Sequence, residues 1–303
     1  MGRQARAYAY GVSTVVLWST VASAFKIALR GLDPAQLLFY ASLTTLLVLG
    51  AILMARGRLF ASLRCTKREL LRSAGLGFLN PFLYYLILFG AYDLLPAQVA
   101  QPLNYTWALV LALLSVPLLR QRLAATDIAA CLICYVGVAV VSLGGGGRAG
   151  VVHAGGVALA LASTVVWALY WIWNTSDRRD AVSTLFMGFL FGTPLTFLWC
   201  AAVSSLRVND PHALLGAAYV GVVEMSVAFV LWLSALRLSE NTARVGNLIF
   251  ISPFLSLALI RFAVGEVIRP GTVAGLALIV GGLLVQGLGG RRIAAVGGSA
   301  GPS

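Results

Sequence analysis

The chain has 303 residues, of which 60% are hydrophobic and 11% charged, and its mean hydropathy is +0.91. These values exclude a water-soluble globular domain and indicate a protein embedded in lipid. The formal net charge is +12, and the basic residues lie mainly in the loops between apolar stretches. This distribution indicates that they set the membrane topology, and it argues against a nucleic-acid partner.

Ten apolar stretches follow one another along the chain, each close to the ~20 residues that a helix needs to cross a bilayer. We expect all-α membrane spans at residues 8–28, 35–55, 71–91, 96–118, 126–144, 155–173, 183–205, 214–236, 241–264 and 270–289. The predicted fold class is an all-α integral membrane protein with ten transmembrane helices.

Loops that are rich in Lys and Arg alternate along the chain with loops that contain few of them. If the N-terminus is cytoplasmic, fifteen of the 22 Lys and Arg residues lie in cytoplasmic loops and four in outer loops. The other three, Lys26, Arg244 and Arg261, lie within or at the ends of spans. This asymmetry follows the positive-inside rule and predicts a multi-pass protein with both termini in the cytoplasm.

The second half of the chain repeats features of the first. A shift of 145 residues places Gly137 on Gly282 and Leu143 on Leu288. Because five is odd, a second five-helix unit enters the membrane inverted, and inverted repeats are typical of transporters with a site near the bilayer midplane. We expect a first repeat at 8–144, a linker at 145–154, a second inverted repeat at 155–289 and a flexible cytoplasmic tail at 290–303.

Polar and aromatic side chains gather near the middle of the spans. With a rise of about 1.5 Å per residue, six of them lie about 12 to 18 Å from a membrane face: Trp18, Asn80, Asn104, Trp107, Trp167 and Glu224. Tryptophan usually collects at the membrane interfaces instead. Helical spacing adds four neighbours on the same helix faces, namely Tyr84, Gln101, Tyr170 and Trp171.

We expect these ten residues to line a central cavity and bind the substrate. Indoles, phenols and carboxamides suit an uncharged or zwitterionic organic molecule that carries an apolar group. The alternative is that they are packing residues, with the amides joining neighbouring helices.

Glu224 is the only acidic residue deep within a predicted span. Arg244 and Lys26 lie about 15 Å and about 10 Å from its level along the membrane normal, so neither is expected to form an ion pair with it. One hypothesis gives Glu224 a role in proton coupling or ammonium recognition. The other makes it a neutral structural carboxyl bonded to an amide such as that of Asn80.

Prolines fall within several spans, and each removes a backbone hydrogen bond. We expect kinks at Pro81, Pro102, Pro117, Pro194 and Pro253. Two interpretations stay open: ordinary prolines of membrane helices, or a paired hinge with one member in each repeat.

The last two spans of each half carry a family resemblance. Residues 247–253, Gly265-Glu266 and Gly281-Gly282, echoed in the first half by residues 103–118 and 135–138, resemble the drug/metabolite transporter superfamily in its EamA-type branch. The first half departs from that pattern, because Ala108 stands opposite Pro253 and Gln121 occupies the position of Glu266.

Within that superfamily the chain resembles bacterial aromatic amino-acid exporters, through Trp18, residues 104–107 and the aromatic sixth span. The resemblance implies a transporter of the bacterial inner (plasma) membrane that exports amino acids, aromatic or other neutral ones, by alternating access. The small-molecule substrate and the lipid bilayer are then its partners. A monomer can enclose such a path alone.

The alternatives to amino-acid export are a multidrug exporter and a membrane-embedded enzyme. A multidrug or quaternary-cation exporter would use Glu224 and the aromatic side chains as its cation site. A membrane-embedded enzyme would need a nucleophile–base pair or metal ligands at one depth, and the sequence has no HExxH motif, paired histidines or serine motif. We therefore expect no catalytic residue, metal site or cofactor.

Overall fold

The computed structural model describes residues 2–107, 109–110, 113–114, 118, 125–144, 153–175, 177, 179–238, 248 and 251–297. Within these residues the regular elements are helices and no strand is present. In chain order they are α1 (Arg3–Ala28), α2 (Pro34–Ala55), α3 (Leu59–Leu63), α4 (Lys67–Gly77), η1 (Phe78–Leu83), α5 (Tyr84–Leu94), α6 (Ala97–Tyr105), α8 (Ala125–Gly144), α9 (Ala154–Thr175), α10 (Ala181–Val203), α11 (Pro211–Tyr219), η2 (Val220–Ala228), α12 (Phe229–Leu238), α14 (Ser252–Leu259), η4 (Ile260–Val264) and α15 (Pro270–Gly297).

Six helical stretches among the described residues are long and apolar enough to cross a membrane: Arg3–Ala28, Pro34–Ala55, Lys67–Leu94, Ala154–Asn174, Ala181–Val203 and Pro211–Trp232. Shorter apolar helices occupy Leu132–Val141, Ser252–Val264 and Pro270–Val285. The expected spans at 96–118 and 241–264 lie partly outside the described residues. The all-helical membrane fold is confirmed, whereas the number of ten spans stays a prediction.

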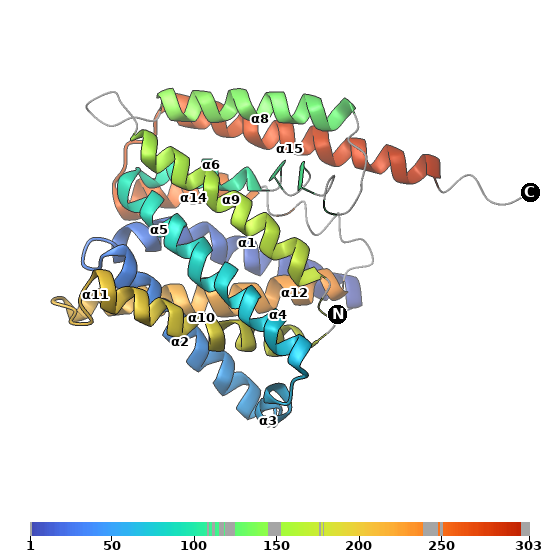
Figure 1. The fold of residues 1–303 in the computed structure, drawn as a ribbon. Helices are drawn as coiled ribbons and strands as arrows, with labels where there is room; N and C mark the ends of the chain where they lie inside the picture. The colour runs from blue at the N-terminus through green and yellow to red at the C-terminus, as the bar shows by residue number, and fades with distance from the viewer. Residues whose placement is uncertain are drawn as a thin grey trace, which may run out of the picture.

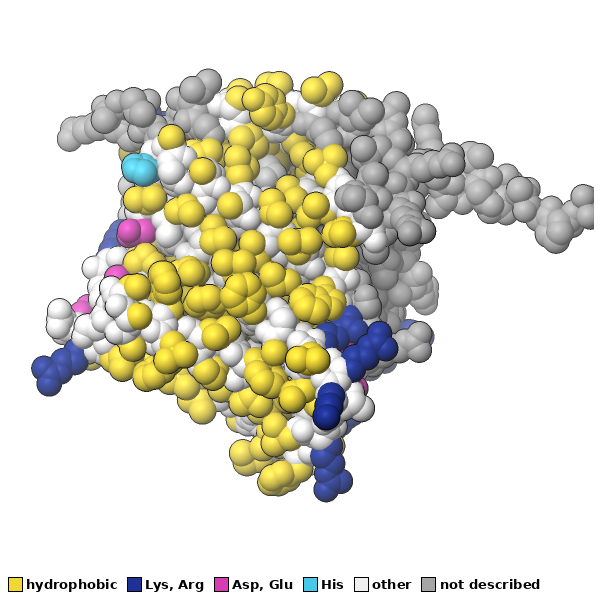
Figure 2. Space-filling view, in the orientation of Figure 1, with side chains coloured by type: hydrophobic (Ala, Val, Ile, Leu, Met, Phe, Trp, Pro, Cys, Tyr) yellow, Lys and Arg dark blue, Asp and Glu magenta, His cyan; other side chains and the backbone are white. Residues whose placement is uncertain are grey.

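The surface matches this assignment. Figure 2 shows an apolar face running across the helices, with lysine and arginine side chains gathered at the end of the bundle near α3. Acidic side chains and a histidine lie toward the opposite end of this face. An apolar band between two charged ends is the surface that a bilayer requires.

The helices pack in pairs that relate the two halves of the chain. α8 lies along α15 at one edge of the molecule, and α2 packs against α10 (Figure 1). α5 packs against α9, and α1 packs against α12. α5 begins at Tyr84 and α12 at Phe229, while α8 begins at Ala125 and α15 at Pro270, so both offsets are 145 residues.

Glycines allow the backbones of α8 and α15 to approach closely. A Cβ atom on Gly137 would lie 2.8 Å from the carbonyl oxygen of Gly275, and one on Gly275 would lie 2.7 Å from the carbonyl oxygen of Gly137. These distances leave no room for a side chain at either position. Small residues at such contacts are typical of helix packing in membranes, where van der Waals contact supplies much of the association energy.

The expected proline kinks have different outcomes. Pro81 lies in η1, where Asn80 has the non-helical angles φ −149° and ψ 119°, so the helix is interrupted there as predicted. Pro194 lies within α10, which runs without interruption from Ala181 to Val203. Pro253 stands in the first turn of α14, where the missing N–H costs no helical hydrogen bond. Pro102 lies within α6, and Pro117 is outside the described residues.

The last helix is longer than hydropathy predicts. α15 continues to Gly297, beyond residue 290, where the flexible tail was expected to begin. Hydropathy ends the span at the Arg291-Arg292 pair, but the segment Arg-Arg-Ile-Ala-Ala-Val contains good helix formers. A membrane span can therefore end before its helix does.

Candidate functional site

A cavity lies between the helices of the bundle and is lined by residues of α1, α5, α6, α9 and η2 and by Trp107. Its lining residues are Trp18, Val21, Ala22, Phe25, Tyr84, Leu88, Tyr92, Gln101, Asn104, Tyr105, Trp107, Trp167 and Glu224. The space open to the centres of water-sized molecules is about 70 Å³. Seven of the ten residues predicted from the sequence line it: Trp18, Tyr84, Gln101, Asn104, Trp107, Trp167 and Glu224.

The other three predicted residues are not part of the lining. Tyr170 and Trp171 stand behind Trp167, with ring centroids 5.5 Å and 5.9 Å from its ring. Asn80 is buried in η1, 3% exposed. Tyr170 and Trp171 therefore pack against the lining residue Trp167.

The remaining lining residues were not among the predicted site residues. Val21, Ala22 and Phe25 follow Trp18 at three, four and seven positions along α1, and Leu88 and Tyr92 follow Tyr84 at four and eight positions along α5. Extending each polar or aromatic residue along its own helix face would have found them. Tyr105 follows Asn104 directly, and both side chains line the cavity. Helical spacing alone does not predict that two successive residues face the same cavity.

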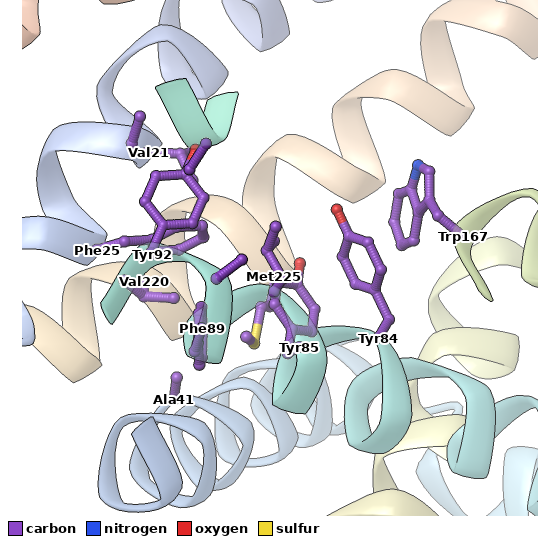
Figure 3. Close-up of a cluster of buried hydrophobic side chains, with 14 of the residues drawn as sticks. Val21, Phe25, Ala41, Tyr84, Tyr85, Phe89, Tyr92, Trp167, Val220 and Met225 are labelled. Atoms are coloured by element: carbon purple, nitrogen blue, oxygen red, sulfur yellow. The ribbon is translucent and has the colours of Figure 1, made fainter. Parts of the chain in front are cut away.

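Stacked aromatic rings form one side of the cavity. The Tyr84 and Trp167 rings lie 4.4 Å apart with an interplanar angle of 24°, and Figure 3 shows the Tyr84 ring between Tyr85 and Trp167. Behind them, Trp171 stacks on Phe229 at 5.6 Å and 6°. Rings fixed by such contacts present a preorganised apolar face on which a flat organic group can stack.

Among the described residues of the lining, Glu224 contributes the one carboxyl group. It lies in η2, a π-helical segment, and π-helical turns within α-helices occur frequently at functional sites. The Tyr85 hydroxyl donates a hydrogen bond of 3.2 Å to its Oε1 atom. The hypothesis that Asn80 binds this carboxyl is therefore corrected, since its hydrogen-bond partner among the described residues is the Tyr85 phenol of α5.

Three polar atoms of the lining are buried without a hydrogen-bond partner among the described residues. They are the Nε1 atom of Trp18, the Oε1 atom of Gln101 and the Oε2 atom of Glu224. Unsatisfied buried polar atoms cost free energy, so such atoms around a cavity indicate water or a ligand. These three atoms are one donor and two acceptors.

The side-chain amide of Asn104 is hydrogen-bonded within the protein. The Asn104 amide nitrogen donates to Ser163 Oγ at 3.0 Å, and its oxygen accepts a hydrogen bond of 3.4 Å from the Tyr84 hydroxyl. No Lys or Arg side chain belongs to the described lining. The ammonium group of Lys26 instead donates to the backbone carbonyl of Tyr92.

Metal ligands do not cluster in the part of the chain that the structure describes, which has no group of three or more His, Cys, Asp or Glu side chains placed to hold an ion. Aromatic stacking, hydrogen bonding and the charge of one carboxyl group are therefore the interactions that these residues offer a solute.

The apolar helical bundle defines a membrane protein, and the cavity between its helices is the candidate solute site. The model of the EamA-like transporter family matches residues 5–143 and 154–287. The chain therefore belongs to the EamA-like transporter family of the drug/metabolite transporter superfamily, and the resemblance seen in the sequence is confirmed.

Curated relatives agree with this assignment. The chain is 28% identical over 303 residues to the aromatic amino acid exporter YddG of Ancylobacter novellus, with 93% of this chain and 97% of the relative covered. It is also 28% identical over 203 residues to an uncharacterized transporter of Acidianus ambivalens, covering 66% of this chain and 78% of the relative. Family and relatives indicate a transporter rather than an enzyme.

A solved structure supports the fold along most of the chain. The match is a crystal structure of a protein that is 25% identical, with a TM-score of 0.68 and coverage of 95% of this chain and 98% of that chain. The similarity therefore extends over both matched segments.

Proposed function

We propose that the protein exports amino acids, aromatic or other neutral ones, across a bacterial inner membrane by alternating access through the central cavity. The observation that carries this proposal is the stacked pair Tyr84 and Trp167 at a cavity whose lining keeps unpartnered hydrogen-bonding atoms. An aromatic side chain can stack on the rings while the polar end of the molecule satisfies those atoms. The name of the Ancylobacter relative supports the same substrate class.

The proposed architecture is two inverted five-helix repeats at 8–144 and 155–289, joined by residues 145–154 and followed by a tail from 290. Two separate matches to one family model support it. The equal offsets of 145 residues support it as well. The pairs α5–α9 and α1–α12 exchange with each other under that shift, as a pseudo-two-fold relation requires. Both termini are then cytoplasmic, and the path lies within one copy of the chain.

Transport requires the cavity to change size. Ligand pockets usually measure about 300 to 1,000 Å³, and the cavity at about 70 Å³ must widen to hold an amino acid. The π-helical segment η1 ends directly before Tyr84, and the π-helical segment η2 contains Glu224. We assign the bending to these two segments, because irregular turns are the places where membrane helices bend with least loss of hydrogen bonding.

Counterflow in proteoliposomes tests the proposal. The purified chain is reconstituted, and uptake of labelled tryptophan, phenylalanine and alanine is followed with and without a pH gradient. Saturable uptake that favours the aromatic amino acids is the expected result. Absence of uptake for all three would reject the substrate class while leaving the family assignment intact.

A multidrug or quaternary-cation exporter is the second candidate. A carboxylate within an aromatic cavity is the observation that favours it, since such cavities bind quaternary ammonium groups. Competition separates the two candidates. If tetraphenylphosphonium or a quaternary ammonium compound is transported and phenylalanine is not, the second candidate replaces the first.

A further inference from the structure

We propose that a groove on the lipid-facing surface binds one phospholipid, with an acyl chain between α1, α11 and α14 and the phosphate at Arg30. The groove is separate from the central cavity, so the inference does not depend on which solute the protein carries. The ligand class is a glycerophospholipid with an anionic phosphate group.

The groove lies on the side of α1 that faces α11, α14 and η4, the helices that pack against it there. Its lining includes Thr20, Ala24, Ile27, Gly216, Leu259 and Ala263. The space open to the centres of water-sized molecules is about 300 Å³, against about 70 Å³ for the central cavity. The groove is therefore large enough to take part of an organic molecule.

The groove opens onto the apolar surface of the bundle. Ile27 and Ala263 of its lining are exposed, and so are Leu215 and Phe262, the sequence neighbours of Gly216 and Ala263. The hydrocarbon of the bilayer covers such a surface in a membrane protein. A hollow in it is expected to hold an acyl chain, because an empty space would deprive its lining of van der Waals contacts.

The depth of the groove matches one leaflet. At its deep end the Thr20 Oγ1 atom and the Tyr219 hydroxyl share a hydrogen bond of 2.7 Å between α1 and α11. Thr20 lies eight residues before Ala28, the last residue of α1, so the groove extends about 12 Å from the end of that helix. Half of the hydrocarbon core is about 15 Å. An acyl chain of the leaflet at this end of α1 therefore has the length to fill the groove.

Arg30 lies at the membrane-surface end of the groove. It follows Ala28 by two residues, it is exposed, and its Nη2 atom donates to the carbonyl oxygen of Val264 at 3.0 Å. Val264 directly follows Ala263 of the lining, so the guanidinium group stands where α1 meets η4. Guanidinium groups bind phosphate through paired, charge-assisted hydrogen bonds. A phosphate there would sit directly above an acyl chain in the groove.

The neighbouring charges are compatible with a phosphate. Arg261 is exposed in the same short helix η4. Asp210 lies at this end as well, since a Cβ atom on Gly31 would be 3.4 Å from its Oδ2 atom. The Oδ1 atom of Asp210 accepts from the N–H of His212 and caps α11. The positive end of the α11 dipole therefore offsets the charge of this aspartate.

The lipid would contact a helix that also lines the solute site. Thr20 and Ala24 face the groove, whereas Trp18 and Phe25 of the same helix line the central cavity. A lipid in the groove thus packs against the back of α1 and restricts its movement. Burial of an acyl chain gains little within a bilayer, because its surroundings are already apolar. Retention of this lipid therefore depends on its fit and on the contact between its phosphate and Arg30.

Native mass spectrometry of the delipidated full chain tests the site. The protein is titrated with palmitoyl-oleoyl-phosphatidylglycerol and with palmitoyl-oleoyl-glycerol, which has the same chains and no phosphate. One phosphatidylglycerol per chain is expected to stay bound, at least about fivefold more than the diacylglycerol. Equal retention of the two lipids would overturn the inference. A dimer without bound lipid would overturn it as well, because the groove would then be covered by a second copy.

Variants locate the lipid. Ala263→Phe fills the groove from η4, and Arg30→Gln removes the charge but keeps a donor for the Val264 carbonyl. Each is expected to lower retention of phosphatidylglycerol at least about fivefold. The controls are Ala202→Phe at an exposed position of α10 and Arg207→Gln in the exposed loop before α11. They are expected to stay within roughly twofold of the wild type.

Photo-crosslinking of the wild type gives a readout that needs no variant to fold. A phosphatidylglycerol with a diazirine on its acyl chain is expected to label peptides of α1 and α14 in preference to the other lipid-facing helices. Labelling spread evenly over those helices would contradict the assignment. Unchanged retention in either folded groove variant would contradict it too.

Discussion

The carboxylate of Glu266 accepts a hydrogen bond of 2.8 Å from the backbone N–H of Ala97, the first residue of α6, although the two residues lie 169 positions apart. Its second oxygen accepts from the N–H of Gln98 at 3.1 Å. The Gln98 side chain reciprocates, because its amide nitrogen donates to the carbonyl of Val267 and its oxygen accepts from the N–H of Arg269. Glu266 thus caps a helix of the first half from a loop of the second.

We predict that Glu266→Ala destabilises the protein by about 1 to 2 kcal/mol, because two N–H groups at the start of α6 lose their acceptor and the helix dipole loses its counter-charge. Thermal unfolding in detergent measures the effect. Asp93→Ala is the matched control, since Asp93 is an exposed acidic residue near the end of α5 and not at the start of a helix. Equal shifts of the unfolding temperature in the two variants would contradict the capping role.

Gly275→Ala is expected to disrupt the pairing of α8 with α15. Its Cβ would lie 2.5 Å from a Val141 methyl carbon and 2.7 Å from the Gly137 carbonyl oxygen, so the helices must separate. The expected loss of stability is about 1 to 3 kcal/mol. Gly281→Ala on the same helix is the control, because its Cβ has no neighbouring atom within 4 Å. Normal folding of Gly275→Ala would show that the close approach is dispensable.

A pH-dependent contribution is expected at the junction of α4, α9 and α10. Burial of the Asp177 carboxyl raises its pKa, but the hydrogen bonds and charge of Arg179 outweigh burial and leave the pKa below its ordinary value of 3.8. The Arg179 guanidinium donates to Asp177 Oδ2 at 2.6 Å and to Ser73 Oγ at 2.9 Å. A carboxyl with a lowered pKa stabilises the folded state above its unfolded pKa, and this contribution is lost as the pH falls through the folded pKa.

Asp177→Asn should therefore lower the unfolding temperature at pH 7, and the difference from the wild type should shrink as the pH falls below 3.8. Asp93→Asn, at an exposed position at the end of α5, serves as the control and should differ little at either pH. A difference for Asp177→Asn that grows toward acid would contradict this account.

The sequence predicted the membrane fold well because long apolar stretches and basic loops are local signals. The ends of α8 at Ala125 and Gly144 fall within one residue of the expected span. Capping residues such as Asp33 and Thr66 fix the starts of α2 and α4. Hydropathy could not predict the extension of α15 to Gly297. It indicates which residues lie in lipid, whereas a helix can continue into water beyond the membrane.

The cavity residues were predicted in part for a similar reason. Depth along a span identified Trp18, Trp167 and Glu224, because distance from the membrane face follows from residue number. The direction in which each side chain points depends on how the helices pack. That information was missing for Asn80, which depth grouped with the lining, and for Tyr170, which helical spacing added to it. It was also missing for Tyr85 as the hydrogen-bond partner of Glu224.

The most direct test of the central claim, that the solute passes through this cavity, is counterflow of labelled phenylalanine in the Trp167→Ala and Trp199→Ala variants. Trp167 is 6% exposed and lines the cavity, whereas Trp199 on α10 is 38% exposed. We predict that Trp167→Ala abolishes saturable counterflow, that Trp167→Phe restores part of it, and that Trp199→Ala stays within roughly twofold of the wild type. Full counterflow in a folded Trp167→Ala variant would contradict the account.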